Sequence, residues 1–517
     1  MTSTAIILVL IIFAVAYLLL SGRLPLILTL VLPRLNHPDI PNLREGQDDS
    51  LYLESLTRGV LVVGRPGSGK TVWLAMQTMI RALANPDCPI FVLDASGSFC
   101  DEFIKLTYQL SQGLREQIES RMIFDRMGDP KYVTAFPFFS DEYGLDVETQ
   151  VMRVTENWKK LQDELVKVNP TMGGIPLGEL APQTYRMLCA IRFKDGSSGQ
   201  ITEAKKLLMN ETWLYEACKK FGKDAPEAKW YFERQFLSLT EPERDLRSYT
   251  LRSILGAVEP KAIRARVGYH TPGWTPREAI EKGQIVLVSG EELINQEQAM
   301  GILFTDVYSQ ILAVINERTP HDPTDPPVLM VIDEVPMLLE IKGMAEEIGK
   351  VSPRYRSRRL QIIVIIQMLA QLDDDLRKKI WSLGNTACFG IDSHKEAYEI
   401  AQQLFNYDPQ KIKFAATSDT GQPIVEQDRG GYLIGANWLQ HLPARSLVLK
   451  RWIDEGTEER FVQFIQSTSD KPDGPLPTEL IEIKEQLLER TAIPIEEALK
   501  AVNSRTLKTE NQPPTVG

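Results

Sequence analysis

The sequence predicts an α/β fold with a mainly parallel sheet, an all-helical insertion and an N-terminal transmembrane helix. Short apolar runs alternate with helix-like stretches from about residue 51, which is typical of a parallel sheet with helices on its faces. Residues 146–265 contain long helix-like stretches and few strand candidates. An unbroken apolar run at 5–20 is, with its uncharged flanks, long enough to cross the roughly 30 Å core of a bilayer.

The apolar run at 5–20 is expected to be a membrane anchor. No basic residue precedes it and no clear small-residue cleavage site follows it, which disfavours the alternative of a cleaved signal peptide. Arg23 and Arg34 follow the run, so the positive-inside rule places the main body of the protein in the cytoplasm, at the inner membrane. A second apolar stretch at 24–32 is too short to span alone and is either interfacial or half of a bent hairpin.

The strand candidates share short apolar runs bounded by turn residues. Those expected in the parallel sheet lie at 59–63, 89–93, 122–124, 285–288, 328–332, 361–366 and 387–391. Two later candidates, at 446–452 and 460–465, are expected to form an antiparallel pair at one edge.

A complete phosphate-binding loop follows the first of these strands. Its residues are Gly64, Arg65, Pro66, Gly67, Ser68, Gly69, Lys70 and Thr71. The glycines let backbone N–H groups wrap around the α- and β-phosphates, Lys70 reaches the β- and γ-phosphates, and the Thr71 hydroxyl ligates Mg²⁺. A helix-like stretch at 72–84 follows, as this loop requires. The sequence therefore predicts ATP and Mg²⁺ as cofactors.

The strand candidate at 328–332 ends in Asp333 and Glu334. Its continuous apolar run is typical of a strand buried on both faces of a parallel sheet. Asp333 is placed to hold Mg²⁺, and Glu334 can deprotonate a water for in-line attack on the γ-phosphate. The alternative interpretation is a pair of helix-capping acids. Together with the phosphate loop, the adjacent acid favours hydrolysis over binding alone.

The composition constrains the partners. The 517-residue chain has a formal net charge of −11 at pH 7, so a surface for nucleic acid must be local or built by oligomerisation. Its five cysteines are scattered, without a Cys-x-x-Cys pair or metal-like spacing to histidines. We expect reduced, structural thiols in a cytosolic compartment.

The chain divides into five expected segments. They are an anchor and linker at 1–45, the first part of a nucleotide-binding domain at 46–145, an all-α insertion domain at 146–265, the second part of the nucleotide-binding domain at 266–468, and a C-terminal linker, helix and disordered tail at 469–517. The C-terminal helix is expected at 478–502.

The order of these pieces resembles a known family. An anchor, the phosphate loop, Asp94 after the next strand, a helical insertion, Asp333-Glu334, an arginine-rich stretch at 354–359 and an apolar strand ending in Gln367 follow one another. This order resembles the coupling ATPases of type IV secretion and conjugation (TraG/TraD-like), within the FtsK/HerA superfamily of P-loop motors. The resemblance covers roughly residues 51–466.

The resemblance implies a RecA-like P-loop NTPase that forms a ring, usually a hexamer, and drives DNA through a central channel. It implies that Lys70 and Thr71 bind phosphate and metal, and that Asp333 supports the metal. Glu334 would be the water-activating base and Gln367 the sensor of the γ-phosphate. Secretion-channel or relaxosome proteins are the implied partners.

An arginine from a neighbouring subunit commonly completes such sites. Arg354 and Arg356, in the dense run at 354–359, are the first candidates for this arginine finger, and Arg264 and Arg266 are a weaker second choice. The run is alternatively a solvated helix face or a surface for DNA phosphates.

Two features depart from the family pattern. After Asp94 the family usually has a lysine and a glycine, whereas this chain has Ala95, Ser96, Gly97 and Ser98. Asp94 is still able to support the metal shell through a water. Many family members also have two spanning helices around an external domain, for which residues 1–45 leave no room.

Three alternative functions stay open from the sequence. The first is a HerA/FtsK-like packaging or segregation motor, and the second is a membrane-tethered ATPase that remodels protein. The third is a membrane-anchored nucleotide switch. An Asn-Lys-x-Asp motif for guanine recognition is absent from the sequence, and Glu334 suits turnover better than a slow switch.

Overall fold

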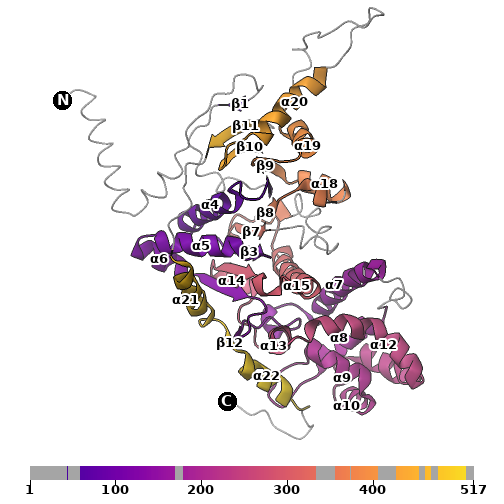
Figure 1. The fold of residues 1–517 in the computed structure, drawn as a ribbon. Coiled ribbons are helices and arrows are strands. Elements are labelled where there is room, and N and C mark those ends of the chain that lie inside the picture. The colour runs from indigo at the N-terminus through magenta and orange to yellow at the C-terminus, as the bar shows by residue number, and fades with distance from the viewer. Residues whose placement is uncertain are drawn as a thin grey trace, which may run out of the picture.

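The computed structural model describes residues 43–44, 59–168, 178–333, 355–372, 374–405, 427–452, 460–466 and 475–507. At its centre is a ten-stranded sheet in the order β1-β11-β10-β9-β2-β8-β7-β3-β6-β4 (Figure 1). Seven of these strands are mutually parallel: β2 Gly59–Val63, β3 Ile90–Asp94, β4 Met122–Arg126, β6 Ile285–Ser289, β7 Val328–Asp333, β8 Leu360–Ile366 and β9 Gly384–Cys388. The predicted α/β class and mainly parallel sheet are confirmed.

Beyond β9, towards one edge of the sheet, the predicted antiparallel pair is present. β10 Ser446–Trp452 pairs with both β9 and β11 Arg460–Gln466 in antiparallel register. The short strand β1 Leu43–Arg44 then lies parallel to β11.

Alternating strand residues face two separate cores, because both faces of the sheet are covered. On one face, Val60 and Val62 pack with α4 Lys70–Ala84, α5 Ser98–Gln109 and α6 Gln112–Glu119. On the other face, Leu61 and Val63 belong to the larger core. That core includes α14 Pro276–Glu281, α15 Glu297–Asn316, α18 Asp374–Trp381, α19 His394–Leu404 and α20 Gln427–Gln440.

One predicted strand is shifted along the chain. The apolar residues at 387–391 indicated a strand there, but β9 begins at Gly384 and ends at Cys388. Pairing decides the register, since Gly59 lies opposite Gly384 and Val63 opposite Cys388. The turn-like residues at its start are therefore in the strand, and Phe389 lies beyond its end.

A helical region lies between the short strand β5 Tyr132–Val133 and β6. Its helices are α7 Val147–Val168, α8 Leu180–Ala190, α9 Ala204–Met209, α10 Glu211–Phe221, α11 Pro226–Tyr231, α12 Glu241–Leu255 and α13 Lys261–Gly268. Buried ion pairs join this region to the sheet side: Arg153 of α7 with Asp306 of α15, and Arg266 of α13 with Asp125 of β4. The expected division into domains stays a prediction.

The C-terminal helix predicted at 478–502 is two helices. α21 Pro477–Leu488 and α22 Ile495–Ser504 are separated by β12 Ile493–Pro494, which pairs with β5. Pro494 lacks an N–H donor and disfavours helical backbone at the residue before it, so the chain is extended here.

One helix among the described residues, α15, is long and apolar enough to span a membrane, and 83% of its most apolar window is buried inside the fold. It is a core helix that packs against α7 and α14. The anchor predicted at 5–20 lies outside the described residues.

Candidate nucleotide-binding site

The phosphate loop joins β2 to α4 at the carboxyl edge of the sheet. Its first residues are fixed to the neighbouring strands, because the Gly64 N–H donates to the Ile366 carbonyl at 3.4 Å and the Arg65 N–H donates to the Gly390 carbonyl at 2.7 Å. Arg65 also forms an ion pair with Asp392 at 3.0 Å. The start of the loop is therefore held in place by residues at or just after the ends of the neighbouring strands.

The glycines of the loop are required by its shape. Gly67 and Gly69 have φ values of 71° and 97°, a region that side chains disfavour. A Cβ on Gly64 would lie 2.5 Å from the Cβ of Phe389. Gly69 is the N-cap of α4 and provides no side-chain cap, so the N–H groups of the first turn point toward a site suited to an anion.

Lys70 lies within the loop and is 5% exposed. Its ammonium donates to the carbonyls of Gly64 at 2.5 Å and Arg65 at 2.9 Å. The buried hydroxyl of Ser68 has no hydrogen-bond partner among the described residues. A phosphate group, which accepts hydrogen bonds, fits this set of donors, and Thr71 stands next to Lys70 on α4.

Asp333 lies at the same edge of the sheet as the phosphate loop. It is the buried last residue of β7. β8 separates β7 from β2, with Val63 opposite Ile366 and Ile332 opposite Val364. Two strand spacings place the ends of β2 and β7 about 10 Å apart. This gap suits a triphosphate with a cation between Thr71 and Asp333, both of which have oxygen donors.

Two other predicted residues relate to this gap. Gln367 follows β8 directly, at the strand end between the loop and Asp333, and is half-buried. Glu334 lies outside the described residues. The roles assigned to both from the sequence stay predictions.

Asp94 ends β3 and pairs in register with Asp333. One carboxylate oxygen accepts hydrogen bonds from the backbone N–H groups of Ser96 at 3.1 Å and Gly97 at 2.9 Å, and the other accepts from that of Cys100 at 3.0 Å. Burial raises the pKa of Asp94 and these hydrogen bonds oppose the rise. Both oxygens are thus engaged by the turn that leads into α5, here called the Asp94 turn (residues 94–98).

The described arginines of the dense run lie at the opposite edge of the sheet, before β8. The seven residues of β8 separate them from Gln367 by about 20 Å. Arg358 Nε donates to the Arg318 carbonyl at 3.2 Å, and Arg359 donates to the Pro323 carbonyl at 2.6 Å. Arg356 is half-buried, and Arg354 lies outside the described residues. At this distance, Arg356 is too far away to reach a nucleotide bound at the phosphate loop of its own chain.

Of the two arginines in the second choice of finger, Arg266 is unsuited to the role. Arg266 is 2% exposed and binds both oxygens of Asp125, at 2.6 and 2.9 Å. Arg264 donates to Asn503 at 2.7 Å. Arg266 is therefore bound within the chain's own fold, whereas Arg264 is half-buried and its predicted role stays a prediction.

The sequence reasoning missed Arg445, which precedes β10 and contacts the loop. Its N–H donates to the Ser68 carbonyl at 3.0 Å, and a Cβ on Gly69 would lie 3.3 Å from its Cγ. Arg445 has a φ of 62°, which is uncommon for a residue other than glycine. A single arginine after Leu442-Pro443-Ala444 has no sequence signal that would have identified this contact.

Comparisons with known proteins give three kinds of result. Residues 327–431 match the family model described as "TraM recognition site of TraD and TraG". Among curated proteins, none matches the chain. Similar solved structures include the bacterial conjugative coupling protein TrwBdeltaN70 in its unbound form, with 14% identity and a TM-score of 0.49 over 82% of this chain and 89% of that one.

Two further structures are similar to the chain. TrwB in complex with the non-hydrolysable ATP analogue ADPNP has 13% identity and a TM-score of 0.46 over 81% of this chain and 88% of that one. VirB4 of Thermoanaerobacter pseudethanolicus has 14% identity and a TM-score of 0.40 over 80% and 89%. From the family match, which includes β7, β8, β9 and α19, the chain is TraG/TraD-like over residues 327–431.

Proposed function

We propose that this chain is a membrane-anchored ATPase that drives DNA, or a DNA–protein complex, as the coupling protein of conjugation or type IV secretion. The main support is the position of two features at one edge of the sheet. The phosphate loop follows β2 and Asp333 is the last residue of β7, with only β8 between these strands. The TraG/TraD-like segment contains Asp333 and Gln367.

The chemistry proposed for this site assigns one task to each residue. Lys70 and the amides of the first turn of α4 bind and orient the triphosphate. Thr71 and Asp333 would hold Mg²⁺, which when bound neutralises charge on the phosphates. Glu334 accepts the proton of the attacking water, and the Gln367 amide donates to an oxygen of the γ-phosphate.

The site is completed in a ring, which we propose to be a hexamer. Arg356, or Arg354, stabilises charge on the γ-phosphate bound by the adjacent subunit. Its support is position, because Arg356 lies about 20 Å from the phosphate edge of its own chain.

The remaining parts of the proposal concern partners and location. The matched family model bears the name of a TraM recognition site, so we propose that residues 327–431 contact a DNA-processing protein of the relaxosome. The apolar run at 5–20 anchors the chain in the inner membrane, with the main body in the cytoplasm.

The test is ATP turnover by the detergent-solubilised chain with and without DNA. DNA is expected to stimulate turnover, and its affinity is expected to fall steeply as salt rises, because phosphate contacts release counterions. Turnover that no DNA stimulates, at any salt concentration, would reject the proposal. Imaging with ATP checks the ring.

A membrane-tethered protein-remodelling ATPase is the second candidate, favoured by the net charge of −11. Stimulation by unfolded protein and not by DNA would select it. A HerA/FtsK-like packaging or segregation motor would show DNA stimulation but no binding to relaxosome proteins.

A further inference from the structure

The C-terminal segment at 475–507, here called the C-terminal belt, lies across two parts of the molecule (Figure 1). α21 packs on β4 and α5, next to the sheet. β12 pairs with β5, with Ile493 opposite Val133, and α22 packs on α13 of the helical region. The belt therefore contacts both the nucleotide-binding sheet and the helical region.

The far end of the belt is fixed to the helical region by several contacts. The Lys194 N–H donates to the Thr506 carbonyl at 3.0 Å, and Phe193 forms a β-bridge with Leu507. Arg505 and Glu203 lie 3.8 Å apart, with side chains only 1% and 3% exposed. Position 507 is thus an integrated part of the fold.

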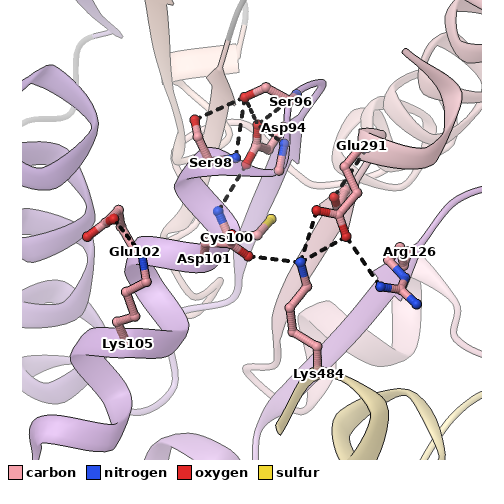
Figure 2. Close-up of polar contacts among 12 residues, drawn as sticks. Asp94, Ser96, Ser98, Cys100, Asp101, Glu102, Lys105, Arg126, Glu291 and Lys484 are labelled. Carbon is pink, nitrogen blue, oxygen red and sulfur yellow. Dashed lines mark hydrogen bonds and ion pairs between the residues drawn. The ribbon is translucent and has the colours of Figure 1, made fainter. Parts of the chain in front are cut away.

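The near end of the belt packs against the core through α21, which also contains a buried cation, Lys484. Its ammonium donates to Asp101 at 2.9 Å and to the two carboxylate oxygens of Glu291 at 2.8 and 2.9 Å. Figure 2 shows the ammonium between these two carboxylates. Only 7% of the side chain is exposed. Burial lowers the pKa of Lys484, but hydrogen bonds to Glu291 and Asp101 outweigh it and raise the pKa overall.

Both residues that bind Lys484 also contact the Asp94 turn, Asp101 through its backbone N–H and Glu291 through its carboxylate. The Asp101 N–H donates to the Gly97 carbonyl at 3.0 Å, in the first turn of α5. A Cβ on Gly97 would lie 2.8 Å from Oε2 of Glu291, so this carboxylate lies directly against the turn. The Gly290 N–H donates to the Asp94 carbonyl at 2.9 Å. Lys484 thus braces the turn from two sides.

The Asp94 turn in turn lies against Asp333. Asp94 and Asp333 are opposite each other on adjacent strands, and both side chains are buried at the carboxyl edge. A shift of the turn would therefore move Asp94, the neighbour of Asp333 on the adjacent strand. The phosphate loop follows β2, which lies two strands from β7, so it would be less affected.

We propose that Lys484 is a positioning residue of the ATP site: from the C-terminal belt, it holds the Asp94 turn so that Asp333 keeps the geometry needed for the metal-bound nucleotide. This inference rests on the proposed ATPase function. The competing interpretation is a buried ion pair that contributes to stability alone.

The test compares Lys484→Met with a matched control in the full-length, detergent-solubilised chain. Glu485→Ala lies on the same helix and breaks the exposed pair of Glu485 with Lys131. The measurements are the melting temperature, the affinity for a fluorescent ATP analogue with and without Mg²⁺, and kcat and KM below the melting transition.

For Lys484→Met we expect unchanged affinity without Mg²⁺, because the phosphate loop is intact. The gain in affinity from Mg²⁺ and the kcat are each expected to fall roughly tenfold, as for residues that support metal ligands. Lys484→Arg is expected to restore part of both, and Glu485→Ala to change neither. A lower melting temperature with wild-type Mg²⁺ dependence and kcat would overturn the proposal.

If Lys484→Met does not fold, Asp101→Asn gives the same test, because Asp101 is partly exposed and the amide keeps the size of its side chain. The same change in Mg²⁺ dependence is expected, and its absence rejects the positioning role. Failure of the ATPase proposal is recognised separately, by turnover that persists in Lys70→Ala.

Discussion

The two edges of the parallel sheet differ in what their charged residues do. At the carboxyl edge, the first-turn amides of α4 lack a side-chain cap and the Lys70 ammonium lies within the phosphate loop. At the amino edge, the side chains of Arg358 and Arg359 donate to loop carbonyls that precede β7. The first arrangement suits a ligand, and the second stabilises the chain's own loops.

This difference shows that strand direction locates the site better than the density of charge in the sequence. Parallel strands bring residues 70 and 333 to one edge although more than 250 residues separate them. The arginines at 356–359 are close in sequence to Gln367 but a full strand length away from it.

Replacing Lys70 by alanine is expected to have the largest effect on the carboxyl edge. The loop loses the cation that meets the β- and γ-phosphates, so nucleotide binding or turnover is abolished. Binding of a fluorescent ATP analogue and phosphate release measure the result. Normal turnover in this variant would mean that the nucleotide site lies elsewhere.

At the amino edge, Arg356→Ala is expected to lower turnover by a factor on the order of 10³ without loss of ATP binding, if the arginine acts on a neighbour. Arg358→Ala is the matched control, with less than about twofold change, because its side chain is bonded to the Arg318 carbonyl.

Mixing Arg356→Ala subunits with Lys70→Ala subunits is expected to restore some turnover, since each subunit supplies what the other lacks. Absence of rescue, together with absence of rescue for Arg354→Ala, would remove this cluster from the interface.

Asp125→Ala tests whether Arg266 has a stabilising role or a catalytic one. Arg266 would be left buried without its carboxylate, which is expected to lower the free energy of unfolding by about 3–5 kcal/mol. Denaturant unfolding measures this loss. Turnover per folded molecule is expected to stay within about twofold, and a selective loss of turnover would place Arg266 in the site after all.

Gln367→Ala tests the strand end between the loop and Asp333. The variant loses one donor to the γ-phosphate, so kcat is expected to fall by about 10²-fold with ATP affinity retained. Steady-state kinetics and equilibrium binding separate the two quantities. A rise in KM alone would indicate a binding role in place of γ-phosphate sensing.

Asp306→Asn concerns the interior between the helical region and the sheet. Burial raises the pKa of Asp306 from 3.8 to about 6, against the opposing effect of Arg153. The folded state therefore holds the proton more tightly, and this contribution to stability, complete below pH 3.8, is lost as the pH rises through 6. In the wild type, the free energy of unfolding is expected to fall by on the order of 1–3 kcal/mol from pH 4 to 7 because of Asp306, and the variant is expected to lack this fall. If the free energy of unfolding of the variant changes with pH as it does in the wild type, Asp306 is not the source of this dependence.

The sequence was sufficient to predict the elements whose signal is local. The apolar runs of β2 and β7 are buried on both faces, and their strands are observed where they were expected. The phosphate loop was recognisable because its glycines and Lys70 are adjacent in sequence. The alternating pattern also predicted that the strands are parallel, which brings Asp333 to the edge of the loop, but it did not predict that only β8 lies between β2 and β7.

What the sequence did not predict depends on contacts between distant residues. Lys484 lies within the stretch that was expected to be a helix at 478–502, and its partly exposed partner Glu291 is 193 residues away. The start of β9 at Gly384 is set by pairing with β2, which outweighs the weak strand propensity of Gly384 and Asn385. Arg445 likewise meets the loop through the fold alone.

The burial of α15 has a consequence for counting membrane crossings. A hydropathy profile would score this helix as a membrane span and place the residues before and after it on opposite sides of the bilayer. β3 precedes α15 in the chain and β7 follows it, yet the two strands are hydrogen-bonded neighbours from Ile90 to Asp94. A bilayer between them would cut the sheet in two, so both halves of the nucleotide-binding sheet share one compartment.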